Sequence, residues 1–93
     1  MQEFYTVNPD IVFRDEGEDG GLLFDPATGE VKILNECASL IMKCLDGKHS
    51  RQHIIDKLQE IFPDVESATL EQDVSAFLTE MKEKQLIGAL LNQ

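Results

Sequence analysis

Residues 22–34 decide the fold and read Leu22-Leu23-Phe24-Asp25-Pro26-Ala27-Thr28-Gly29-Glu30-Val31-Lys32-Ile33-Leu34. Two short apolar runs, residues 22–24 and 30–34, flank a segment of turn-forming residues. Proline presets φ in such a turn and glycine accepts a positive φ, so the stretch predicts a β-hairpin. Residues 11–14, Ile-Val-Phe-Arg, predict one more strand before the hairpin, and the acidic, glycine-rich residues 15–21 predict the loop between them.

After the hairpin the apolar residues change from a period of two to a period of about 3.6, which predicts helices. We expect the first helix to begin after Asn35, a good N-cap, and to end at Asp46-Gly47. The second should begin at Ser50 and stop before Pro63, and the third should open with a capping box. That capping box is formed by Thr69 and Gln72.

The order of these elements predicts the fold class. The chain has 93 residues, which is enough for one core and too few for two, so we expect a single domain over residues 1–93. Strands followed by helices are typical of α+β proteins. A three-stranded antiparallel sheet followed by three helices is winged-helix-like.

The charge limits the possible partners. Eighteen acidic residues against eight basic ones give a net charge of −10. Such a surface repels nucleic acid and anionic lipid, although the same acidity also serves simply to keep a small domain soluble. No apolar stretch is long enough to cross a bilayer, and the first residues lack the pattern of a signal peptide. We therefore expect a cytoplasmic monomer or weak dimer that binds neither nucleic acid nor a membrane.

Motifs for catalysis or for binding a metal or cofactor were sought and not found. The sequence lacks a P-loop, a GxGxxG and an HExxH motif, so we expect no enzyme activity and no cofactor. Cys44, His49 and His53 have a superficially zinc-like spacing, but His49 precedes the Ser50 cap and is not on the helical face of His53. Cys37 and Cys44 lie roughly 10 Å apart along the predicted helix, too far to bridge, and we interpret both as buried thiols.

The third predicted strand supplies the most useful feature for binding. If residues 22–24 pair with one side of residues 30–34, the other side is an unpaired edge, which can accept a strand from another chain. The alternative is that Glu30 and Lys32 merely blunt this edge. The residues alone leave both readings open.

The sequence also resembles the PqqD family, whose name refers to pyrroloquinoline quinone biosynthesis protein D. The most specific points of resemblance are the Leu34-Asn35 pair that opens the first helix and the Asp46-Gly47 pair that closes it. The remaining matches are spread over residues 8–88 and comprise Leu22-Leu23-Phe24-Asp25-Pro26, Gly29, Val31, Glu36, Ile41, Leu45, Ile54-Ile55, Leu58, Phe62, Asp73-Val74, Phe77-Leu78 and Leu86-Ile87.

This resemblance implies a function and a site. Proteins of this family bind the leader of a ribosomally made precursor peptide and present it to a radical S-adenosylmethionine enzyme. The leader is added as a strand against the third strand, beside the third helix. Carried over to this chain, the implied peptide-binding residues are Val31, Lys32, Ile33, Leu34, Asp73, Ala76, Phe77, Glu80 and Lys84.

The rival hypothesis is a winged-helix regulatory module that binds protein or DNA. DNA binding requires a basic recognition helix, because that helix must meet phosphates. The predicted third helix instead carries Glu71, Asp73, Glu80 and Glu83 against Lys82 and Lys84. The sequence thus favours a peptide-binding protein.

Overall fold

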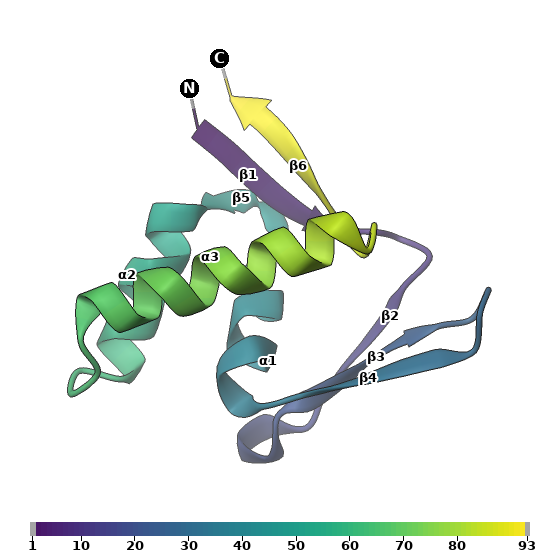
Figure 1. Cartoon of the computed structure of the whole chain (residues 1–93), viewed down its shortest axis with the longest axis horizontal. Helices are drawn as coiled ribbons and strands as arrows, with labels where there is room; N and C mark the ends of the chain where they lie inside the picture. Colours follow the sequence, from purple (N-terminus) through teal and green to yellow (C-terminus); the bar gives the residue numbers. More distant parts are fainter. Residues whose placement is uncertain (1, 93) are drawn as a thin grey trace.

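The computed structural model describes residues 2–92, which form two small sheets and three α-helices (Figure 1). The elements are, in chain order, β1 (Gln2–Val7), β2 (Val12–Asp15), the 3₁₀ turn η1 (Gly17–Asp19), β3 (Gly21–Asp25), β4 (Glu30–Leu34), α1 (Glu36–Lys43), β5 (Asp46–Ser50), α2 (Arg51–Ile61), α3 (Ser67–Glu83) and β6 (Ile87–Asn92). None of the helices in this described part is long and apolar enough to cross a membrane.

The first sheet, called here the hairpin sheet, has the antiparallel order β2-β3-β4. Its β3–β4 turn closes as predicted: the Asp25 carbonyl accepts a hydrogen bond from the Gly29 amide at 2.7 Å, and Gly29 has φ +77°. Leu23 pairs with Lys32, and Gly21 pairs with Leu34. The three predicted strands are thus confirmed, and β4 lies at the edge of the sheet, with no strand among residues 2–92 on its far side.

The second sheet, called here the terminal sheet, was not predicted. Its order is β5-β1-β6, and β1 and β6 run side by side so that the two chain ends meet (Figure 1). Val7 pairs with Ile87, two residues that are far apart in the sequence. The α+β, winged-helix-like class is confirmed, but the sequence pattern accounted for only one of the two sheets.

Two of the predicted helix boundaries are wrong. The side chain of Asn35 caps α1 as expected, accepting a hydrogen bond from the Ala38 amide at 2.8 Å. However, α1 ends at Lys43, and the Asp46-Gly47 pair belongs to β5, where Gly47 has φ +80°. A glycine with positive φ suits a strand irregularity as well as a helix end, so the signal was real but misassigned.

The second wrong boundary is the start of α3. This helix begins at Ser67 after Glu66, which makes no side-chain capping bond, so the capping box predicted from Thr69 and Gln72 does not form. The prediction for α2 holds. Its Ser50 side chain accepts a bond from the His53 amide, and the Ser50 amide donates a bond to His53 Nδ1.

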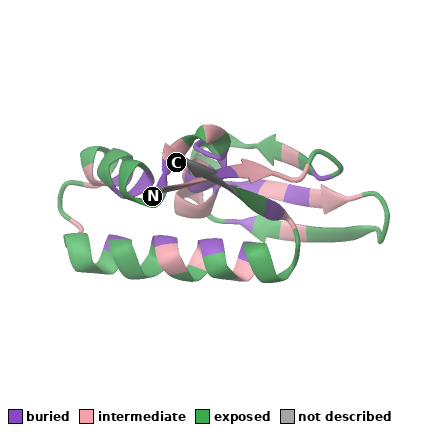
Figure 2. Cartoon of the chain, turned by 90° about the horizontal axis from the view of Figure 1, so that it is seen from above, coloured by how far each residue is buried: buried purple, intermediate pink, exposed green. Residues whose placement is uncertain are grey.

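The core lies between the helices and one face of each sheet. Each helix turns its buried residues inward, and Figure 2 shows α3 with a buried stripe on the side facing the rest of the molecule and an exposed outer side. The residues exposed by 2% or less include Leu23, Leu34, Ser39, Ile41, Ile54, Leu58, Leu70, Val74 and Met81. Leu23 and Leu34 anchor the hairpin sheet to this core, which fixes the position of β4 relative to α3.

Candidate functional site

The free edge of β4 lies opposite the C-terminal half of α3. We call the space between them the β4–α3 groove. At the end nearest the hairpin turn, this groove opens into a pocket of about 440 Å³ whose lining residues come from β3, β4, the turn and the segment after α3. The lining residues are Ile11, Leu23, Asp25, Thr28, Glu30, Val31, Lys32, Lys84 and Leu86.

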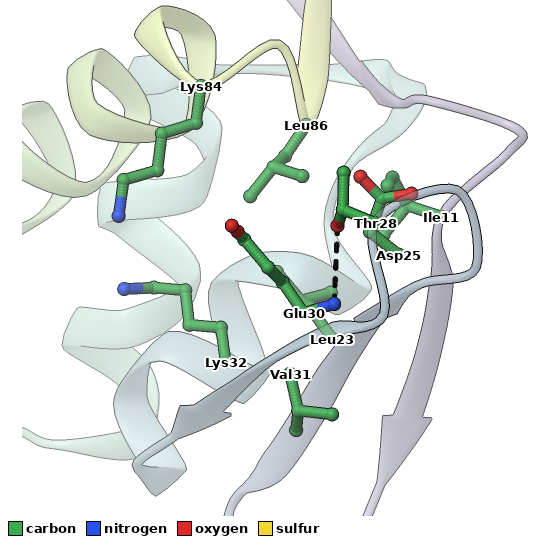
Figure 3. Close-up of a pocket in the computed structure, with 9 residues that line it drawn as sticks. All are labelled: Ile11, Leu23, Asp25, Thr28, Glu30, Val31, Lys32, Lys84 and Leu86. Atoms are coloured by element: carbon green, nitrogen blue, oxygen red, sulfur yellow. Dashed lines mark hydrogen bonds between the residues drawn. The ribbon is translucent and has the colours of Figure 1, made fainter.

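The pocket has an apolar wall and charged side chains at both ends and between them (Figure 3). Leu23 and Ile11 are buried, and Leu86 is half-buried. Lys32 and Lys84 approach one end from opposite sides, Asp25 lies at the other end, and the Glu30 carboxylate points between them, below Leu86. Such a pocket suits a peptide segment that carries an apolar side chain between polar ones.

Ion pairs cross the groove beside the pocket. Lys32 Nζ on β4 donates to Glu80 Oε1 on α3 at 3.1 Å, and Lys84 Nζ donates to the same oxygen at 3.1 Å. Hydrogen bonds from Lys32 and then Lys84 lower the pKa of Glu80 below its usual value of 4.5. The three side chains are between one-third and about one-half exposed, so a bound peptide could exchange partners with them at small cost.

The other end of the groove lies where β4 leads into α1. Cys37, in the first turn of α1, is half-buried against the core, as is Phe77 on α3. Burial raises the pKa of the Cys37 thiol, and the carboxylates of Asp73 and Glu36 raise it further. Asp73 lies on α3, so charge on that helix acts on this thiol.

The structure brings together some of the residues implied by the family resemblance and separates others. Lys32, Glu80 and Lys84 form the ion-paired cluster described above. Asp73, Ala76 and Phe77 share a helical face with Glu80 by their spacing, and the first two are exposed. By contrast, the Leu34 side chain is 2% exposed and belongs to the core, so only its backbone is on the edge strand.

Val31 and Ile33 take a different position. Figure 3 shows the Val31 side chain on the opposite side of β4 from Lys32 and Glu30. Ile33, two residues along, shares the face of Val31 and is 76% exposed. Neither side chain therefore contributes to the α3 side of the sheet, although Val31 touches the rim of the pocket.

Sequence reasoning missed the apolar residues of the pocket. Ile11 and Leu86 come from segments that flank the sheets and are tied together by Asn8, whose amide donates to the Leu86 carbonyl at 2.9 Å. The Ile11 amide donates to the Asn8 carbonyl at 3.0 Å. No local pattern signals a bond between residues so far apart, so only the fold reveals this wall of the pocket.

Comparison with known proteins assigns the chain to a family. Residues 20–87 match the family model described as Coenzyme PQQ synthesis protein D (PqqD). The chain belongs to the PqqD family. A curated relative, the "PqqA binding protein" of Acinetobacter baylyi (strain ATCC 33305 / BD413 / ADP1), is 43% identical over 54 residues. That match covers 58% of this chain and 52% of the relative, so the chain matches about half the length of this protein.

Solved structures share the fold of this PqqD-family chain. The structure titled "Lasso peptide synthetase B1 complexed with the leader peptide" is 30% identical with a TM-score of 0.74, and the match covers 94% of this chain and 98% of that one. The structure titled "TbiB1 in Complex with the TbiA(beta) Leader Peptide" is 22% identical with a TM-score of 0.77, covering 94% and 99%. At that identity the second likeness establishes the fold alone.

Proposed function

We propose that this protein is a non-catalytic peptide chaperone. It binds the leader of a ribosomally made precursor peptide and presents it to a radical S-adenosylmethionine enzyme, in pyrroloquinoline quinone biosynthesis or a related pathway. The observation that carries the proposal is the free edge of β4, which faces the groove side of α3 and a pocket with an apolar wall. The names of the relative that binds PqqA and of the lasso protein complexed with a leader support the same role.

The binding mode is strand addition. The leader forms main-chain hydrogen bonds with β4, which are indifferent to its side chains, while the pocket selects an apolar residue. Lys32 and Lys84 favour an acidic residue beside it, because each can exchange Glu80 for a carboxylate of the peptide. All nine residues implied by the family resemblance keep a part in this proposal. Leu34 contributes only its backbone, and Val31 and Ile33 contribute mainly theirs.

Hydrogen exchange tests strand addition directly. Successive amides of a strand point to opposite edges, so only every second amide of β4 can bond to an added strand. With a synthetic PqqA peptide as the probe, NMR exchange should show new protection at alternate residues among 30–34. Protection at every residue, or at none of them while the peptide is bound, would place the leader elsewhere.

Calorimetry with the same peptide tests the pocket. Leu86→Ala removes apolar surface from the pocket wall and should weaken binding by about tenfold, or about 1.4 kcal/mol. Ile61→Ala is the control, because Ile61 is an exposed aliphatic residue on α2 outside the pocket lining. A peptide that binds neither wild type nor variant would refute the chaperone role.

A further inference from the structure

The hairpin sheet has a second face, turned away from the core, and this face is apolar. The strand register sets two rows across it, Val12–Phe24–Val31 and Arg14–Leu22–Ile33. Val12, Val31 and Ile33 are 52%, 54% and 76% exposed, and Leu22 and Phe24 are half-buried. We call Val12, Leu22, Phe24, Val31 and Ile33 the outer face.

This arrangement departs from the usual alternation of apolar and polar residues in a sheet that has one face in solvent. An antiparallel sheet that packs on a core with one face normally carries polar residues on the other. Here Leu23 and Leu34 already anchor the inner face, so the apolar residues outside serve no purpose in the core. A contiguous exposed apolar patch of this kind marks an interaction surface.

We propose that the outer face docks the modifying enzyme that receives the leader, through a protein surface that is apolar at its centre and rich in Lys and Arg at its edge. This proposal rests on the proposed function and names the surface that brings the two proteins together. The groove holds the peptide, and the opposite side of the same strand holds the enzyme.

The charge around the outer face selects this partner. Glu16, Glu18 and Asp19 are exposed in and before η1, which meets the end of β4 where Gly20 lies against the Leu34 carbonyl. The cation of the two rows, Arg14, is paired with Glu16 at 3.3 Å. A second copy of this chain would bring the same acidic rim and a net charge of −10 against it, whereas a basic rim would be attracted.

Because the outer face continues into the groove, the enzyme should bind the protein more tightly when a leader is bound. A strand added to β4 widens the outer face from three strands to four, because every second side chain of the leader points the same way as Val31 and Ile33. An enzyme on this face would then touch both the chaperone and the leader. We expect its affinity for the complex to exceed its affinity for the free chaperone at least threefold.

The test is the double variant Val12→Thr/Leu22→Thr. Neither residue lines the pocket or lies on β4, and threonine suits a strand while removing apolar contact from the outer face. Binding of a purified radical S-adenosylmethionine enzyme that modifies PqqA, the peptide in the name of the relative, should weaken at least tenfold, while leader affinity stays within twofold. The control is Ile61→Thr, because Ile61 is 51% exposed on α2 and matches Val12 in exposure.

The two proposals fail in distinguishable ways. An unchanged enzyme affinity in the double variant, or an enzyme that does not bind the wild type, overturns the docking surface whether or not the leader binds. If the wild type does not bind the leader, the chaperone role is overturned, but the docking surface is not. A wild type that sediments as a dimer and a double variant that sediments as a monomer would assign the outer face to a second copy instead.

Discussion

At the scale of single residues, Glu80 connects the two sides of the groove and does so in a pH-dependent way. Its lowered pKa means that the folded protein holds the carboxylate charged more strongly than the unfolded chain does. The stabilisation is therefore complete at neutral pH and is lost as pH falls below the usual value of 4.5 through the lowered folded value. Because the pair is partly exposed, its worth is below about 1 kcal/mol.

The variant Glu80→Gln tests this reading. The free energy of unfolding of wild type should exceed that of Glu80→Gln at about pH 7, and the difference should shrink as the pH falls below 4.5, because protonated Glu80 no longer pairs with Lys32 and Lys84. Urea titrations at several pH values measure it. Glu83→Gln, an exposed change on the same helix, is the control, and an equal pH-dependent loss there would point to overall charge instead.

Gly20 is the residue on which the position of β4 depends most. It has φ +89°, and a Cβ built there would lie 2.0 Å from the Leu34 carbonyl oxygen. Gly20→Ala must therefore displace the backbone at the end of β4, and we expect it to lower the free energy of unfolding by about 3 kcal/mol or more.

Gly17, three residues earlier, supplies the control. It also has a positive φ, of +64°, but open space surrounds a Cβ built there. Gly17→Ala should cost only the conformational strain, about 1 kcal/mol. Thermal or urea unfolding of the two variants separates strain from collision, and similar losses in both would show that the close approach to Leu34 is unimportant.

At the scale of elements, local signals predicted the parts of the structure that are local. The β3–β4 hairpin was predictable because Pro26 and Gly29 encode its turn, and α2 was predictable because Ser50 caps it. β1 and β6 were not, since their pairing joins the two ends of the chain and neither carries strong alternation. The Asp46-Gly47 pair misled because a positive φ at Gly47 is compatible with two structures.

The same limit applied to the candidate site. The predicted hairpin placed Lys32 on the edge strand, whereas Phe77, Glu80 and Lys84 were implied by the family resemblance and not by a local pattern. Ile11 and Leu86 reach the pocket only through contacts between segments that are far apart in the sequence.

Cys37 reports on the far end of the groove. The thiol is half-buried, and its raised pKa keeps it mostly protonated at neutral pH, so alkylation should be slow but measurable. Saturating precursor peptide should slow the reaction of Cys37 with a maleimide at least tenfold, because an added strand covers the junction of β4 with α1. Mass spectrometry of the labelled protein reads the site.

Cys44 is the internal control for that experiment. It is 8% exposed at the end of α1, and its slower labelling should not depend on the peptide. If Cys37 is labelled at the same rate with and without bound peptide, the peptide does not reach the junction of β4 with α1. The peptide-binding site is then confined to the region between Lys32 and the pocket.

At the scale of the whole molecule, Asn8 ties the segment between β1 and β2 to the turn before β6. Its amide and its side-chain Nδ2 donate to the Leu86 and Gln85 carbonyls, at 2.9 and 3.1 Å, and its side-chain oxygen accepts from the Asp10 amide at 3.0 Å. Gln85 has φ +61°, so the turn that places Leu86 is held in an unusual conformation. Together with the bond from the Ile11 amide to the Asn8 carbonyl, these bonds hold Ile11 and Leu86 on the same side of the pocket.

Asn8→Ala removes the side-chain bonds and leaves the backbone bond in place. We expect it to lower the free energy of unfolding by about 1–2 kcal/mol, since each exposed hydrogen bond is worth about 1 kcal/mol or less and the turn at Gln85 loses support. Leader binding should weaken about threefold to tenfold, because Ile11 and Leu86 are then no longer fixed against one another.

Asp10→Ala is the matched control, since it keeps the amide that bonds to Asn8. Urea unfolding and calorimetry give the two quantities, and a variant that is destabilised yet binds the leader as tightly as wild type would separate the joint between these two segments from the peptide site.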